Sequence, residues 1–259
     1  MRDSKIGDPT ILFEHPHFLL VDKPAGLFSQ AAIGIDNLEH SLIELLTKRD
    51  AHPGTPFVGL PHRLDRGTSG VMLIARNARA LKRFGEQFQS RKISKYYMAV
   101  LEGQMSEPTS RWEDYVRKIP DRPIAEICAS DVPDAKLATL DAHRIVTDGD
   151  RTLVLLQLYT GRMHQIRIQA AQRGLPVLGD WTYRGSGHFG PLDDQDQRQC
   201  MALHSLRIEF RHPQTGKLTT GTADIPPTWE SLPAPIISAA RAHIRQSQLQ
   251  LDCEYKCPR

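Results

Sequence analysis

The segment HRLDRGTSG, residues 62–70, leads directly into the apolar run VMLIA, residues 71–75. A continuous apolar run after a turn-rich segment predicts a strand that is buried in a sheet. Asp65 is then expected at the edge of a rigid sheet, between Arg63 and Arg66. Because neighbouring cations favour the charged form of a carboxyl group, Asp65 can act as a nucleophile. It can equally form a structural ion pair.

Other strands and helices are predicted on both sides of this segment. Apolar runs and alternation predict strands at residues 17–23, 94–101, 137–146, 152–159, 203–212 and 218–224. Helices are predicted after Asp36 or Asn37, after Asn77, after Thr160 (from about Gly161 or Arg162) to a stop at Gly174, and at residues 235–251. Residues 107–134 are expected to form loops with short strands. Strands outnumber helices and several form hairpins, so we expect an α+β fold with a mixed, largely antiparallel sheet and helices packed on it.

The composition is that of a globular protein. The chain has 259 residues, of which 40% are hydrophobic and 24% charged, enough for one large domain or two closely packed halves. No signal peptide and no run of about 18 apolar residues is present. Cys128, Cys200, Cys253 and Cys257 form no Cys-x-x-Cys pair, and we expect reduced thiols in a cytoplasmic protein.

Basic residues are concentrated in one region, although the net charge is only +3. Between residues 76 and 95 there is a single acid, Glu86, and the basic residues are Arg76, Arg79, Lys82, Arg83, Arg91, Lys92 and Lys95. Such a cluster is typical of a phosphate-binding face. It is also compatible with an ordinary solvated helix.

Two further segments carry residues suited to chemistry. Tyr96 and Tyr97 follow Lys95 in a predicted strand, where alternation places one tyrosine on each face. The segment TGRMHQIR, residues 160–167, brings Arg162 to a predicted helix start, which favours anions. A strand tyrosine is usually a packed aromatic residue, and a single arginine is usually a surface charge.

Five motifs in this order are similar to those of the ribosomal large-subunit synthase A (RluA-type) family of RNA pseudouridine synthases. The resemblance covers about residues 11–230 and implies a bent sheet with the active site in a central cleft. The motifs are EHPHFLLVDKPAGL (14–27), HRLDRGTSG (62–70), Lys95-x-Tyr97-x-Ala99, GRMHQIR (161–167) with Gly174, Pro176 and Gly179-Asp180, and Leu203-His204 with His212-Pro213-x-Thr215-Gly216.

The resemblance implies roles for individual residues. Asp65 corresponds to the catalytic aspartate, Tyr97 to the tyrosine that contacts the target base, and Arg162 to the basic partner of Asp65. Arg63 is similar to the arginine that holds the everted nucleotide or fills its place. The remaining residues expected to line the pocket or contact RNA are Ile166, Leu203, Arg66, Lys95, His164, Gln165, Arg79, Lys82 and Arg83.

The implied reaction converts uridine to pseudouridine without a cofactor or a metal. One carboxylate suffices because no water is added and uracil leaves as a delocalised anion, whereas ordinary glycosidases need two. Asp65 either adds to C1′ or removes the 2′ proton to give a glycal, and the sequence does not separate these routes. The aromatic and aliphatic walls would exclude water.

The resemblance also implies an organisation and a partner. We expect an extension at residues 1–10, a catalytic domain of two packed halves at 11–231 and a helical tail at 232–259. The chain begins almost directly at this domain, without room for the N-terminal RNA-binding module of some members. The expected partner is ribosomal or transfer RNA with an accessible loop uridine, bound by a cytoplasmic monomer away from membranes.

Two other functions remain open from the residues alone. The first is a non-catalytic RNA-binding protein on the same scaffold, against which the complete set of Asp65, Tyr97 and Arg162 argues. The second is a metal-dependent hydrolase that uses Asp65 with His62, His164 and His204, although these histidines lack the spacing of a metal motif.

Overall fold

The computed structural model describes residues 7–32, 34–50, 54–190 and 200–256, with side chains as far as Gln246. The strands are β1 (Thr10–His15), β2 (Phe18–Lys23), β3 (Ser69–Ala75), β4 (Ser94–Glu102), β5 (Thr109–Lys118), β6 (Ala125–Cys128), β7 (Lys136–Asp148), β8 (Arg151–Leu158), β9 (Leu203–Arg211) and β10 (Leu218–Thr222). The helices are α1 (Leu38–Asp50), α2 (Ala78–Gln89), α3 (Gln165–Gln172) and α4 (Ala234–Lys256), with short 3-10 helices η1 (Trp181–Tyr183) and η2 (Pro227–Ser231).

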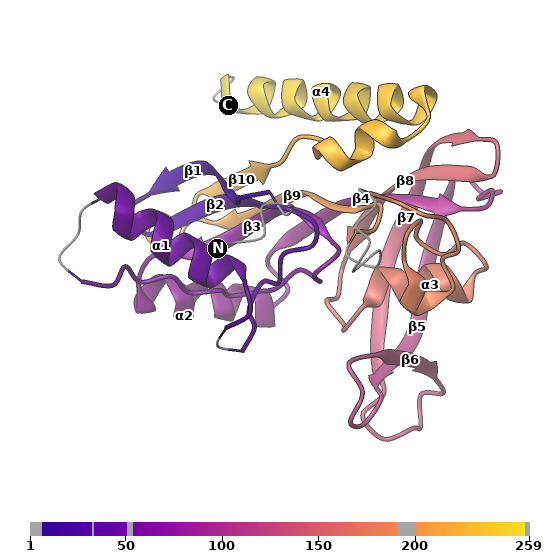
Figure 1. Cartoon of the computed structure of the whole chain (residues 1–259), viewed down its shortest axis with the longest axis horizontal. Helices are drawn as coiled ribbons and strands as arrows, with labels where there is room; N and C mark the ends of the chain where they lie inside the picture. The colour runs from indigo at the N-terminus through magenta and orange to yellow at the C-terminus, as the bar shows by residue number, and fades with distance from the viewer. Residues whose placement is uncertain (1–6, 33, 51–53, 191–199, 257–259) are drawn as a thin grey trace.

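The strands form one sheet with the order β1-β2-β3-β9-β4-β8-β7-β5-β6, and β10 also pairs with β9. Strands β1–β3 lie at the left of Figure 1 and β5–β8 at the right, with β4 and β9 between them. The β3–β9 pair is parallel, whereas the other strand pairs described are antiparallel. The predicted α+β fold with a mixed, largely antiparallel sheet is confirmed.

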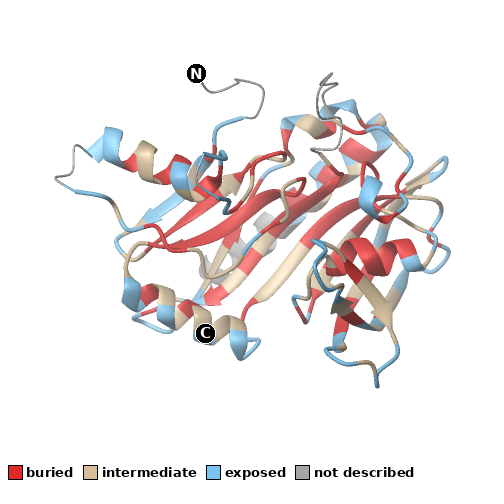
Figure 2. Ribbon diagram, turned by 60° about the horizontal axis from the view of Figure 1, so that its bottom comes forward, coloured by how far each residue is buried: buried red, intermediate tan, exposed pale blue. Residues whose placement is uncertain are grey.

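The strand that follows the Asp65 segment is fully buried, as its apolar run predicts. All residues of β3 are buried, and Figure 2 shows buried residues along the central strands, with exposed residues on the outer faces of the helices. Strand β3 joins β9 where Gly70 pairs with Ser205. Gly70 has φ 111°, and an added Cβ would lie 2.2 Å from the Ser205 carbonyl oxygen, so only glycine fits this crossing.

Asparagine side chains begin the first two helices, as the sequence predicts. Asn37 Oδ1 accepts a hydrogen bond from the His40 amide at 3.0 Å, before α1. Asn77 Oδ1 accepts one from the Ala80 amide at 2.8 Å, before α2. An N-cap acceptor satisfies one of the free amides of the first turn. Helix α4 runs along the top of Figure 1, and α2 lies below the strands at the left.

The structure differs from the predictions at three places. Residues 107–134 contain the long strand β5, in which Trp112 and Val116 are buried while most of their neighbours are exposed. A second strand, β1, precedes the predicted one and forms a hairpin with it. Thr160 does not cap a helix, because α3 begins only at Gln165 after a turn that includes His164 at φ 52°.

The remaining predicted elements have the expected places. The β7–β8 and β9–β10 hairpins are present, and Gly174 follows the end of α3 with φ 69°. The C-terminal helix α4 is longer than predicted. Cys128 and Cys200 are free thiols, whereas the Cys253 and Cys257 side chains lie outside the described residues.

Candidate functional site

A cleft with a volume of about 1060 Å³ lies where the loop before β3, the start of β4 and the β8–α3 connection meet. Most of the predicted site residues line it: Asp65, Tyr97, Arg162, Arg63, Arg66, Lys95, His164, Gln165, Ile166 and Leu203. Segments about a hundred residues apart in the chain therefore form one cavity. Arg79, Lys82 and Arg83 do not line it.

Asp65 pairs with Arg167 rather than with Arg162. Arg167 Nη1 lies 2.8 Å from Asp65 Oδ2, whereas Arg162 Nε donates to the Leu137 carbonyl at 2.9 Å. The predicted Asp65–Arg162 ion pair is therefore wrong. The prediction failed because α3 starts later than expected. Arg162 therefore lies in the turn before the helix, whereas Arg167 lies in the first turn of the helix and faces inward.

Arg167 is itself held by a second carboxylate. Its Nε and Nη2 donate to Asp180 at 2.6 and 2.8 Å, and its guanidinium lies 5.1 Å from the centre of the Tyr183 ring. Burial opposes the charge of Arg167, but the hydrogen bond and charge of Asp180 and the charge of Asp65 outweigh it and raise its pKa. The cation beside Asp65 is thus permanently charged and fixed in direction.

His164 approaches the same oxygen of the Asp65 carboxylate as Arg167. Its Nε2 is 3.8 Å from Asp65 Oδ2, and its Nδ1 lies 2.9 Å from the Tyr183 hydroxyl. Burial lowers the pKa of His164, although the charge of Asp65 opposes this effect. At neutral pH the ring is therefore uncharged, and Arg167 supplies the positive charge that Asp65 meets.

Tyr97 places its phenol in the cleft from β4. The side chain is 8% exposed, and its hydroxyl interacts with the side chain of Ser205, the residue that Tyr97 faces on β9. Burial is the main cause that raises the Tyr97 pKa to about 12, so the hydroxyl keeps its proton at neutral pH. Tyr96 points to the other face, where Arg207 lies 4.0 Å from its ring centre. The predicted alternation of the two tyrosines is confirmed.

The wall beside Tyr97 is apolar. Ile166 and Leu203 line the cleft and are 4% and 3% exposed. They belong to the same core cluster as Tyr97. Because an aromatic ring and aliphatic side chains meet at one end, this part of the cleft suits a flat ring that must be kept from water.

Lys95, Arg162 and Arg91 line the cleft, and none of them forms an ion pair with an acidic side chain among the described residues. Lys95 Nζ donates to the Thr160 carbonyl at 3.2 Å. Burial and then the charge of Arg162 lower the Lys95 pKa to about 8, and burial and the charge of Arg91 lower that of Arg162. An anion between these residues would relieve their mutual repulsion.

A buried lysine supports the loop that carries Asp65. Lys23 Nζ donates to the carbonyl oxygens of Pro24, Leu27 and Arg66 at 2.9, 2.7 and 3.2 Å. The Gly26 amide also donates to the Arg66 carbonyl at 2.8 Å. The turn after β2 thus binds the residue next to Asp65 and fixes the loop that carries it.

Among the described residues, no group of three or more His, Cys, Asp or Glu side chains could hold a metal ion. The histidines of the metal alternative have other partners. His62 Nε2 accepts from the Leu73 amide at 3.0 Å, and His204 Nδ1 lies 2.9 Å from Ser69 Oγ. No described helix is long and apolar enough to cross a membrane.

The structure adds residues that the sequence did not single out: Arg167, Asp180, Tyr183 and Ser205. Arg167 and Asp180 lie within quoted motifs, and an arginine beside the apolar Ile166 at a helix start was a usable signal for a buried ion pair. Tyr183 and Ser205 carry no such signal, because their roles depend on long-range contacts.

Comparison with known proteins gives consistent results. The family model described as RNA pseudouridylate synthase matches residues 17–172, more than half of the chain. "Ribosomal large subunit pseudouridine synthase D" of Pseudomonas aeruginosa is 31% identical over 221 residues, covering 80% of this chain and 65% of its own. "Ribosomal large subunit pseudouridine synthase C" of Buchnera aphidicola is 30% identical over 215 residues, covering 80% and 64%. The chain thus spans slightly less than two thirds of the length of these relatives.

Solved structures show the same fold. "Human RNA Pseudouridylate Synthase Domain Containing 4" has a TM-score of 0.68 at 19% identity, covering 91% of this chain and 93% of its own. "Human RNA Pseudouridylate Synthase Domain Containing 1" has a TM-score of 0.65 at 23% identity, covering 89% and 87%. The family match over more than half of the chain decides the relationship. The chain belongs to the RNA pseudouridylate synthase family.

Proposed function

We propose that this protein isomerises uridine to pseudouridine in RNA, with Asp65 as the catalytic residue. One observation carries the proposal: the Asp65 carboxylate is held by Arg167 at 2.8 Å in the cleft that Tyr97 also lines. A pre-aligned carboxylate beside an aromatic and apolar pocket fits chemistry at a sugar–base bond. Family membership supports the same reaction.

In the proposed reaction the N1–C1′ bond breaks, uracil rotates, and C5 bonds to C1′. The proton that leaves C5 is matched by the proton that N1 gains, so nothing is added overall. Asp65 either attacks C1′ or removes the 2′ proton, and both routes need an ionised carboxylate. Arg167 favours that form, because an adjacent cation stabilises a carboxylate.

Tyr97 is proposed to pack on the uracil ring and hold it during its rotation. Because its pKa is raised to about 12, its hydroxyl can donate a hydrogen bond to the base at neutral pH. Passing the C5 proton through this hydroxyl would need a base that receives it in turn. Ile166 and Leu203 complete the pocket and limit the access of water.

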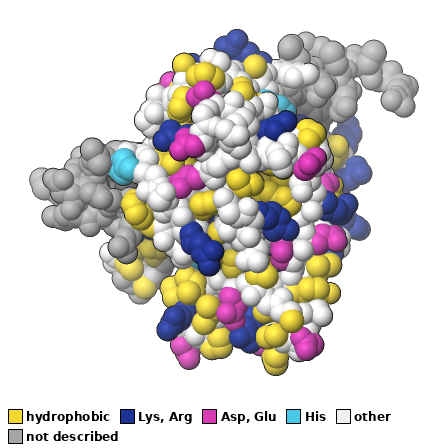
Figure 3. All heavy atoms as spheres, turned by 90° about the vertical axis from the view of Figure 1, so that its right-hand side faces the viewer, with side chains coloured by type: hydrophobic (Ala, Val, Ile, Leu, Met, Phe, Trp, Pro, Cys, Tyr) yellow, Lys and Arg dark blue, Asp and Glu magenta, His cyan; other side chains and the backbone are white. Residues whose placement is uncertain are grey.

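The target uridine must leave its stack, which costs a few kcal/mol. We propose that Arg63 occupies or steadies the vacated place. Arg66, Lys95, Arg162, His164 and Gln165 line the cleft around Asp65, where they would contact the nucleotide and its phosphates. On the end of the molecule that faces the viewer in Figure 3, charges of both signs are interspersed. The RNA is therefore expected at the cleft and along α2, with its Arg79, Lys82 and Arg83.

The proposed substrate is ribosomal RNA of the large subunit, because the matched relatives carry that RNA in their names. Transfer RNA with an accessible loop uridine is the second candidate. Single-stranded loops are favoured because their bases are already partly unstacked. We also propose that the protein acts as a cytoplasmic monomer, without a cofactor.

The test is pseudouridine formation in ribosomal and transfer RNA from cells that lack the gene. Wild-type protein should form pseudouridine at specific positions, and Asp65→Asn should form none while binding the RNA with nearly unchanged affinity. Full activity of Asp65→Asn would contradict the role of Asp65. Binding without any product from the wild type would favour the non-catalytic RNA-binding alternative.

Tyr97→Phe separates the ring from the hydroxyl. If the ring alone holds the base, the variant should retain most of its turnover. A loss of about a hundredfold, equal to about 2.7 kcal/mol, would assign the hydroxyl to the chemical step. Tyr96→Phe is the matched control, because its phenol lies on the opposite face of the same strand, outside the cleft.

A further inference from the structure

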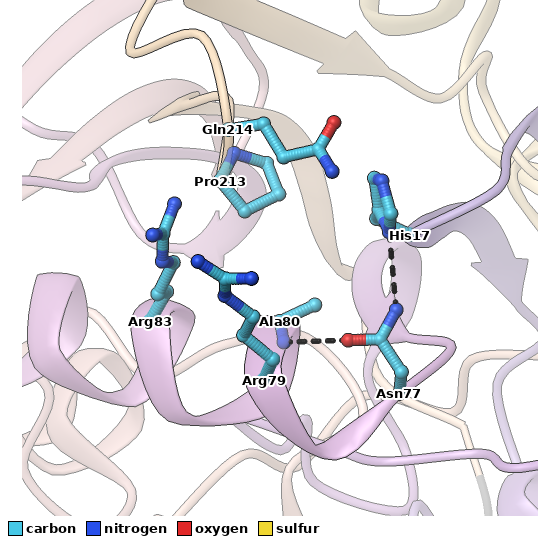
Figure 4. A pocket seen from close by; sticks show the side chains of 7 residues that line it. All are labelled: His17, Asn77, Arg79, Ala80, Arg83, Pro213 and Gln214. Atoms are coloured by element: carbon cyan, nitrogen blue, oxygen red, sulfur yellow. Dashed lines mark hydrogen bonds between the residues drawn. The ribbon is translucent and has the colours of Figure 1, made fainter.

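A second cavity, with a volume of about 330 Å³, lies outside the cleft. It is formed by the first half of α2, the β1–β2 turn and the turn after β9 (Figure 4). We call it the α2 pocket, and its lining residues are His17, Asn77, Arg79, Ala80, Arg83, Pro213 and Gln214. None of them lines the cleft. The described lining contains no acidic side chain, so its charge is positive.

Two arginines supply this charge. Arg79 and Arg83 are one helical turn apart, which places them on the same face of α2, and Figure 4 shows both guanidinium groups beside Pro213. In the described part of the chain neither forms an ion pair, whereas Arg76, just before them, lies 2.6 Å from Glu14. Two adjacent unpaired guanidinium groups repel each other unless an anion lies between them.

A further hydrogen-bond donor faces the same space. Asn77 Oδ1 accepts from the Ala80 amide, so its amide nitrogen faces His17 Nδ1 at 3.1 Å. A neutral imidazole that accepts at Nδ1 carries its hydrogen on Nε2. The N-cap of α2 therefore makes His17 a hydrogen-bond donor at Nε2, and Figure 4 shows the Gln214 amide close to that ring.

We propose that the α2 pocket binds a backbone phosphate of the substrate RNA, at a distance from the uridine in the cleft. The inference depends on the proposed function, since it assumes an RNA in the cleft. Guanidinium groups match the oxygens of a phosphodiester in number and geometry. The pocket holds the strand that flanks the target and makes no contact with the target itself.

Helix α2 connects the two sites. Its last residues, Phe88 and Gln89, line the cleft, and its first turns line the α2 pocket. From Arg79 to Gln89 the helix advances about 15 Å, at about 1.5 Å per residue. A strand that leaves the cleft along α2 therefore reaches the pocket after a few nucleotides, passing Lys82 on the exposed side.

The test compares two labelled RNAs: a stem-loop with a uridine in its loop, and the same loop without its stem. The double variant Arg79→Gln/Arg83→Gln should bind the stem-loop about tenfold more weakly. The plot of the logarithm of the association constant against the logarithm of the salt concentration has a negative slope, and its magnitude should decrease by about 0.7–0.9, the value for one phosphate contact. Binding of the isolated loop should be unchanged. With the stem-loop as substrate, KM should rise while kcat stays the same.

The matched control is Arg241→Gln/Arg245→Gln on α4, which removes the same charge from the opposite side of the molecule (Figure 1). It should leave both affinities and both salt slopes unchanged. Gln214→Glu adds a negative charge to the pocket without changing its shape. It should weaken binding of the stem-loop and leave binding of the isolated loop unchanged.

Several results would overturn the inference. They are an unchanged salt slope in the arginine variant, an equal loss for both RNAs, or a wild type that binds the stem-loop no better than the loop. These are binding measurements, so they judge the α2 pocket even if no pseudouridine forms. Conversely, a normal product yield with an unchanged slope would reject the pocket and leave the proposed function intact.

Discussion

Arg167→Lys is the substitution that tests the site most directly. Arg167 donates three hydrogen bonds, two to Asp180 and one to Asp65. Lysine keeps the charge but presents a single ammonium group, which cannot copy the guanidinium fork. Asp180 is 1% exposed and Asp65 is more accessible, so the ammonium should remain with Asp180. Asp65 would then lose its partner while the fold keeps its buried charge pair.

The expected loss follows from one hydrogen bond between charged groups, about 1.5–3 kcal/mol. If that bond aligns Asp65 in the transition state, the rate should fall about 10–150-fold. The assay is the single-turnover rate of pseudouridine formation at saturating RNA, with the affinity for RNA measured separately. We expect the rate to fall and the affinity to stay within about twofold of the wild type.

Arg173→Lys, at the C-cap of the same helix, is the control. Arg173 Nη1 lies 2.8 Å from Asp114 Oδ2 and its guanidinium 4.9 Å from the centre of the Trp112 ring, outside the cleft. The Arg173→Lys variant should lose about as much stability as Arg167→Lys but retain the wild-type rate of pseudouridine formation. A folded Arg167→Lys variant whose rate stays within about threefold of the wild type, or ~0.65 kcal/mol, would refute the role given to the Asp65–Arg167 pair.

Three further predictions follow from the structure. Arg162→Ala should raise KM for RNA more than it lowers kcat, because Arg162 is not part of the Asp65–Arg167 ion pair. Steady-state kinetics test this, and a loss of kcat with unchanged KM would contradict the prediction. Burial lowers the pKa of His62 in the folded protein to about 3, so below pH 6.5 the unfolded chain binds a proton that the folded chain does not, and stability falls with pH. His62→Gln should therefore make the free energy of unfolding fall less steeply as the pH drops below 6.5. Urea titrations at several pH values test this, and parallel curves for both proteins would exclude it. Gly70→Ala should destabilise the protein by more than about 2 kcal/mol. Gly85→Ala in α2, with open space around it, should stabilise the protein by about 0.5–1 kcal/mol. Thermal melts in which both variants resemble the wild type would contradict the requirement for glycine where β3 meets β9.

The sequence predicted the fold where local patterns carry the information. The apolar run of β3 and the N-cap asparagines of α1 and α2 follow short-range rules, and these elements occur where expected. Strand β5 was missed because its alternation is visible only at Trp112 and Val116, between charged neighbours. Those charges are tolerated because one face of β5 remains exposed.

The sequence predicted which residues line the site but not which of them form the ion pair. The motifs placed Asp65, Tyr97 and Arg162 in one cavity, as observed. The partner of Asp65 depends on where α3 begins, and that boundary is set by the turn at His164 and by the hydrogen bond from Thr160 Oγ1 to Gln165 Oε1 at 2.7 Å. A shift of four residues in the N-cap, from Thr160 to His164, is enough to exchange one arginine for another.

The place of β9 between β3 and β4 has a consequence for biosynthesis. Residues 203–211 form a central strand, yet they are translated more than a hundred residues after both neighbours. Until the ribosome has released them, the nascent polypeptide has two unpaired strand edges next to the future cleft. Contacts of such long range slow folding and expose partly folded chains to aggregation. The two halves of the cleft are therefore expected to close onto each other only late in translation, when this strand enters the gap.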